Sequence, residues 1–145
     1  MERSLEMKKE NLLKGEEKIK VCSKENSYFG NRYCLMIDEL LPRKDYKGFN
    51  EINTTIEELV NQRLKLLKEK SLEEALKKSN AMGVKRRLNG KSVLKLSNSV
   101  YLDRKYTDLF NDCTYWYHKK DNNVYVISKD NKILGLIAKI KVEND

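Results

Sequence analysis

The residues best suited to nucleophilic chemistry in this chain are Cys113 and His118, because a thiol becomes strongly nucleophilic when a nearby imidazole accepts its proton. His118 is the only histidine, so no Ser-His-Asp triad with a spare base and no histidine cluster for a metal can be built. Cys113 precedes a predicted strand, and no motif marks an oxyanion site. We interpret Cys113 as a structural cysteine and His118 as a strand-end residue, and we predict no catalytic residue.

Three (D/E)-x-K triplets, a pattern found in many nucleases, occur at Glu16–Lys18, Asp103–Lys105 and Asp130–Lys132. Metal-dependent phosphodiester cleavage needs a further acid from a neighbouring strand to hold the cation. The middle triplet has no acid upstream until Glu74, and the last one falls in a predicted turn. Chance triplets are expected in a lysine-rich chain, so we predict no metal site, and a small nuclease or a sponge for an anionic nucleotide remains an alternative.

The six glycines are scattered through the chain and form neither a P-loop nor a G-x-G-x-x-G motif. These motifs supply the backbone N–H groups that hold nucleotide phosphates. Their absence disfavours P-loop hydrolysis and Rossmann-type cofactor binding, so no cofactor is predicted.

A basic run is the most informative feature of the sequence. Between Val84 and Lys105 there are seven basic residues against one acid, Asp103, which places +6 of the net charge of +8 in this segment. Clustering of this kind favours steering toward a polyanion or an acidic partner. The alternative is a solvated strand face whose lysines discourage edge pairing. The predicted binding residues are Lys85, Arg86, Arg87, Lys91, Lys95, Arg104 and Lys105.

Aromatic residues follow the basic run at Tyr115, Trp116 and Tyr117. Alternation along a strand predicts that Trp116 enters the core while the two tyrosines stay at the surface. Exposed tyrosines can stack on bases. Tyr115 and Tyr117 therefore complete the predicted binding set.

The basic run is predicted to form a hairpin, because RLNGK at residues 87–91 is a turn signal between two alternating segments. We expect a three-residue loop with Gly90 in the left-handed conformation. That register pairs Val84 with Leu94 and places four basic residues on one solvent face: Lys85, Arg87, Lys91 and Lys95. Beyond the hairpin we expect a short helix and a three-stranded meander, over Asp103–Phe110, Thr114–His118, Val124–Ser128 and Lys132–Val142.

In the first half of the chain, the sequence pattern predicts mostly helices. A charged, frayed helix is expected over residues 1–18, followed by strands at Ile19–Ser23 and Arg32–Leu41 around a turn at Lys24–Asn31. Pro42–Asn53 reads as a loop. Capping boxes at Thr54–Glu57 and Ser71–Glu74 predict a helix over about residues 54–70 and a shorter one that ends at Gly83.

Together these elements predict an α+β fold, with an antiparallel sheet and a two-helix unit packed on one face. The length of 145 residues fits a single domain over residues 1–145. The predicted core includes Leu59, Leu64, Trp116, Val126 and Leu136. The three cysteines form no disulfide framework or zinc motif.

The chain has no long apolar run and no secretory signal, so we expect a cytoplasmic protein that does not enter a membrane. Lysine outnumbers arginine 23 to 7 and asparagine occurs 14 times, a usage typical of A/T-rich coding DNA. With its small size, its lack of catalytic motifs and the segment VYVISKDNKILGLIAKIKV, the chain resembles small proteins encoded by phages and mobile elements of low-GC Gram-positive bacteria, among them anti-CRISPR and other anti-defence proteins.

The resemblance implies stoichiometric blocking of a host nucleoprotein machine in the host cytoplasm. We therefore expect a non-enzymatic inhibitor whose partner is a host nucleoprotein or a nucleic-acid-binding protein, reached through the basic hairpin. The alternative is an accessory protein that binds DNA or RNA directly.

Overall fold

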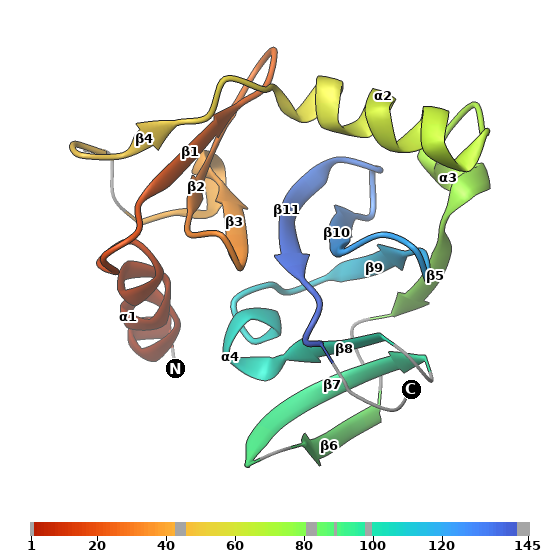
Figure 1. The fold of residues 1–145 in the computed structure, drawn as a ribbon. Coiled ribbons are helices and arrows are strands. Elements are labelled where there is room, and N and C mark those ends of the chain that lie inside the picture. The colour runs from red at the N-terminus through yellow and green to blue at the C-terminus, as the bar shows by residue number, and fades with distance from the viewer. Residues whose placement is uncertain (1, 43–45, 81–83, 89, 98–99, 142–145) are drawn as a thin grey trace. The chain divides into compact units, whose positions relative to one another are not determined.

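The computed structural model describes residues 2–42, 46–80, 84–88, 90–97 and 100–141, with the backbone alone for residues 2–4, 79–80 and 84–86. The chain forms two compact units, Met1–Ala75 and Leu76–Asp145, and their helices and strands are labelled in Figure 1. Helices and mostly antiparallel strands make up the fold, so the predicted α+β class is confirmed. A single domain over residues 1–145 stays a prediction.

Unit 1 (Met1–Ala75) combines helices with short strands in the order β4-β1-β2-β3, in which β4 runs parallel to β1 and the other pairs are antiparallel. The predicted N-terminal helix and first strand are confirmed, whereas β2 lies in a segment predicted as a turn. The elements are α1 Glu2–Leu12, β1 Ile19–Cys22, β2 Ser27–Gly30, β3 Cys34–Ile37, the 3-10 helix Asp38–Leu40, β4 Asn50–Glu51, α2 Ile56–Leu67 and α3 Leu72–Ala75.

Helix α2 begins one residue later than the capping box predicted. The Thr55 hydroxyl, not that of Thr54, accepts a hydrogen bond from the backbone N–H of Glu58 at 3.1 Å. Both threonines have a glutamate three residues on, so the sequence pattern alone fits either register. Of the apolar stripe of α2, only Ile56 is buried; Leu59 and Leu64 are half-buried, so their prediction as core residues was wrong. An amphipathic stripe shows which side of a helix is covered but not how completely.

The second predicted helix is a single turn. The Ser71 hydroxyl accepts from the backbone N–H of Glu74 as the capping box predicted, but α3 ends at Ala75 and the chain continues as a strand from Lys77. The helix was expected to extend to Gly83. This expectation was wrong for residues 76–80, which lie outside the helix. Residues 81–83 lie outside the described part of the chain. Antiparallel pairing with β9 overrides the helical pattern.

Unit 2 (Leu76–Asp145) contains two groups of strands, β11-β10-β9-β5 and β6-β7-β8, and every pair in them is antiparallel. The C-terminal meander and the short helix α4 are confirmed, and β8 was not predicted. The elements are β5 Lys77–Asn80, β6 Val84–Leu88, β7 Lys91–Ser97, β8 Val100–Asp103, α4 Arg104–Thr107, β9 Cys113–Tyr117, β10 Asn123–Ser128 and β11 Ile133–Ala138.

The core of unit 2 is built from its strands. Trp116, Val126 and Leu136 are buried, as predicted, and the middle of β7 is buried on both sides, at Val93 and Leu94. Burial on both sides fixes the register of β7, because a slip of one residue would move each side chain to the opposite face. The register of β7, which carries Lys91 and Lys95, is therefore fixed at its centre.

Candidate nucleic-acid interface

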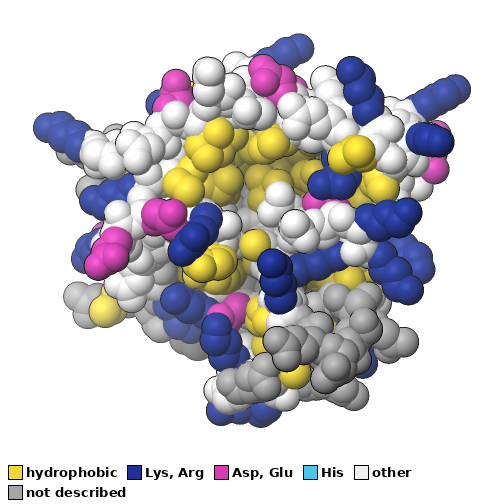
Figure 2. All heavy atoms as spheres, viewed as in Figure 1, with side chains coloured by type: hydrophobic (Ala, Val, Ile, Leu, Met, Phe, Trp, Pro, Cys, Tyr) yellow, Lys and Arg dark blue, Asp and Glu magenta, His cyan; other side chains and the backbone are white. Residues whose placement is uncertain are grey.

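The net charge of the protein divides unevenly between the two units. Unit 1 has 15 lysines and arginines and 15 acids, whereas unit 2 has 15 lysines and arginines and only 7 acids, so unit 2 carries the whole net charge of +8. Figure 2 shows dark blue lysine and arginine side chains spread over the drawn face, with magenta acidic side chains among them. A binding surface for a polyanion is thus to be sought in unit 2.

The β6-β7 hairpin has a register one residue different from the predicted one. Leu88 pairs with Lys91 and Val84 with Lys95, which leaves only positions 89 and 90 in the loop. Gly90 has a φ of +80°, as expected, but it belongs to a two-residue connection. Two-residue loops of the Asn-Gly type are favoured because their twist matches that of the strands.

The corrected register separates basic residues that were predicted to share one face. Arg87 lies opposite Ser92, and its Nη1 donates to the Ser92 hydroxyl at 3.2 Å. Lys91 and Lys95 alternate with Ser92 along β7 and so lie on the other face. The predicted single face of Lys85, Arg87, Lys91 and Lys95 was therefore wrong. At the backbone, positions 85 and 86 lie opposite Leu94 and Val93, and their side chains lie outside the described part.

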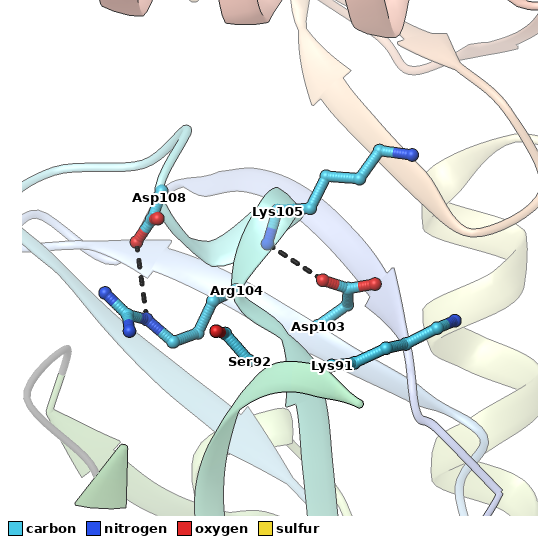
Figure 3. Close-up of a pocket in the computed structure, with 6 residues that line it drawn as sticks. All are labelled: Lys91, Ser92, Asp103, Arg104, Lys105 and Asp108. Atoms are coloured by element: carbon cyan, nitrogen blue, oxygen red, sulfur yellow. Dashed lines mark hydrogen bonds and ion pairs between the residues drawn. The ribbon is translucent and has the colours of Figure 1, made fainter. Parts of the chain in front are cut away.

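The structure brings three of the predicted residues together around one hollow of about 510 Å³. Lys91 comes from the start of β7, and Arg104 and Lys105 come from the start of α4 (Figure 3). The other lining residues are Ser92, Asp103 and Asp108. Three cations and two acids thus line the hollow.

Both acids at the hollow have local structural roles. Asp103 caps α4, because its carboxylate accepts from the backbone N–H of Lys105 at 2.9 Å. Asp108 lies 4.0 Å from Nε of Arg104, in an ion pair whose side chains are 44% and 30% exposed respectively. Exposed pairs contribute little stability, so Arg104 can turn to an incoming phosphate, which its planar guanidinium binds well.

Lys95 lies further along the same face of β7 as Lys91. Its ammonium is 5.8 Å from the ring centroid of Tyr101, its cross-strand partner on β8. What we call the basic surface covers both faces of the hairpin and the start of α4: Arg87 on one face, Lys91 and Lys95 on the other, and Arg104 and Lys105 in α4. These five residues are the predicted basic residues whose side chains the structure describes.

The predicted tyrosines do not belong to this surface. Tyr115 and Tyr117 are buried, and their hydroxyls donate to the backbone carbonyls of Thr107 and Leu96, each at 3.3 Å. Their prediction as exposed binding residues was wrong. A strand covered on both faces buries consecutive aromatics, so the alternation that would leave the tyrosines outside does not apply.

Cys113 is the first residue of β9 and His118 follows its last residue, so the two lie about 16 Å apart at the usual rise per residue of a strand. Burial raises the pKa of the Cys113 thiol, which keeps it protonated and unreactive. The ring Nδ1 of His118 accepts from the backbone N–H of Lys120 at 3.0 Å, in a local turn. The two residues therefore do not form a nucleophile pair.

Asp130, from the last (D/E)-x-K triplet, likewise has a structural partner. Asp130 accepts from the Ser128 hydroxyl, and this bond is the main cause that lowers the pKa of Asp130. Among the described residues, no three side chains of His, Cys, Asp or Glu are grouped so that they could hold a metal ion.

No protein-family model, curated protein or solved structure matches this chain. None of the helices in the described ranges is long and apolar enough to cross a membrane.

Proposed function

We propose that this chain is a non-enzymatic binding protein that attaches to nucleic acid through the basic surface of unit 2, and that it thereby inhibits a host nucleoprotein complex. The observation that carries the proposal is the placement of the whole net charge of +8 in unit 2. Within that unit, Lys91, Arg104 and Lys105 line one hollow. Neutralised phosphates release their counterions, which drives binding of this kind.

Electrostatics favours nucleic acid over the protein part of such a complex. Proteins that handle nucleic acid present a positive groove to it, and a positive surface is repelled from such a groove. Unit 2 would instead cover the nucleic acid and so deny access to its normal ligand. The inhibitory role comes from the resemblance to anti-defence proteins of phages and mobile elements.

The proposal is tested by measuring the affinity for labelled DNA and RNA over a series of salt concentrations. We compare the parent with a variant that lacks three charges of the basic surface, Lys91→Gln, Arg104→Gln and Lys105→Gln. The variant should bind at least about tenfold more weakly, and the slope of log affinity against log salt should become shallower by about 0.9 for each phosphate that is no longer neutralised.

The matched control removes three exposed charges from unit 1, through Lys8→Gln, Lys47→Gln and Lys65→Gln. The control has the same net charge as the test variant, so it separates the position of the charges from their number. Equal weakening by both variants would contradict a localised surface. Tight binding of naked nucleic acid with no effect on any host nucleoprotein would support the accessory-protein alternative.

A further inference from the structure

The end of the β6-β7 hairpin is a two-stranded ribbon. Strand β8 pairs with β7 only from Val93 onward, where Asp103 is the last paired residue before α4 begins. Beyond that point Lys91 and Ser92 pair with β6 alone. The ribbon thus extends beyond the last residue pair that joins β7 to β8.

This ribbon carries positive charge on both of its faces. Arg87 lies on the face of Ser92, and Lys91 lies on the opposite face. Both side chains are exposed. A protein that binds a flat or convex polyanion needs its charges on one face, whereas a ribbon between two phosphate backbones gains from charges on both.

Aromatic residues of unit 2 provide little surface on which bases could stack. Tyr115, Trp116 and Tyr117 are buried, and Tyr106 of α4 is half-buried with its ring centroid 5.3 Å from the Lys105 ammonium. In the described ranges, the exposed large apolar side chains all belong to unit 1: Met7, Tyr33, Ile52 and Leu66. Recognition of single strands relies on stacking, so the basic surface is better suited to a nucleic acid whose bases remain paired.

We propose that the ribbon lies in the major groove of duplex DNA, with Arg87 and Lys91 directed to the phosphates on either side and Arg104 and Lys105 on the adjoining backbone. This inference rests on the proposed function and specifies duplex DNA as the nucleic acid that is bound. The major groove of B-form DNA is about 12 Å wide and admits a two-stranded ribbon. The major groove of A-form RNA is deep and narrow and excludes one.

The test measures affinity for a DNA duplex of about two helical turns, an RNA duplex of the same sequence and the single DNA strand, all at one salt concentration. The DNA duplex should bind at least about tenfold more tightly than the RNA duplex and more tightly than the single strand. A duplex with glucosylated hydroxymethylcytosine, which fills the major groove, should bind at least about tenfold more weakly. Netropsin, which fills the minor groove, should change the affinity less than about twofold.

Two variants of equal charge locate the binding site. Arg87→Gln with Lys91→Gln should weaken duplex binding at least about tenfold, whereas Lys119→Gln with Lys129→Gln, exposed positions in other turns of unit 2, should change it less than about threefold. Preference for RNA or for the single strand, or displacement by netropsin, would overturn the groove assignment and leave the proposed function standing. Absence of binding to every probe would overturn both.

Discussion

At the scale of single residues, burial decides which side chains can reach a partner. Tyr115 and Tyr117 look like surface residues in the sequence, but each hydroxyl is bonded to a backbone carbonyl inside unit 2. Arg104 is half-buried and Lys105 is exposed, as expected because charged side chains seldom become fully buried. Their grouping with Lys91 around a hollow depends on the turn from β8 into α4, and no residue type in the sequence specifies that grouping.

The close approach of β2 to β3 in unit 1 can be tested by substitution of Gly30. A Cβ added at this position would lie 2.0 Å from the carbonyl oxygen of Cys34, in the backbone of the next strand. Gly30→Ala should therefore lower the free energy of unfolding by about 3 kcal/mol, measured by denaturant melts.

Gly48→Ala is the control for this prediction. Gly48 has a φ of +81° and no atom within 4 Å of an added Cβ, so only the left-handed conformation is penalised, at about 1 kcal/mol. An equal loss of stability in the two variants would contradict the close approach of β2 and β3.

At the scale of elements, strong local patterns predict well and short strands do not. The α2 helix and the C-terminal meander follow from periodicity and turn residues. Strands β2 and β8 were missed because their adjacent apolar residues are buried together, as in Tyr28 and Phe29, and so show no alternation. The hairpin register was wrong by one residue because a left-handed Gly90 fits both a two-residue and a three-residue loop.

The N-terminal cap of α2 can be tested by substitution. Thr55→Ala removes the acceptor for the N–H of Glu58 and should lower the free energy of unfolding by about 1 kcal/mol. Thr54→Ala, at the position that the sequence pattern fits equally well, should change it by less than about 0.5 kcal/mol. Denaturant melts that show the larger loss for the Thr54 variant would move the cap back by one residue.

At the scale of the whole molecule, a neutral unit and a strongly basic unit are joined in one chain. The sequence revealed the basic run between Val84 and Lys105, but the boundary between the units was needed to show that unit 1 contributes no net charge. A charge asymmetry of this kind orients the protein as it approaches a polyanion and raises the rate of association, with an effect that salt screens beyond about 8 to 10 Å.

An NMR titration of the isotope-labelled full chain with duplex DNA at physiological salt tests the proposed binding surface most directly. The largest amide shift changes should fall in unit 2, at Arg87, Leu88, Lys91 and Ser92 in the ribbon and at Arg104 and Lys105 in α4, and unit 1 should change little. Largest changes in unit 1, for example around the ring cluster of Phe29, Tyr46 and Phe49, would contradict the proposed surface.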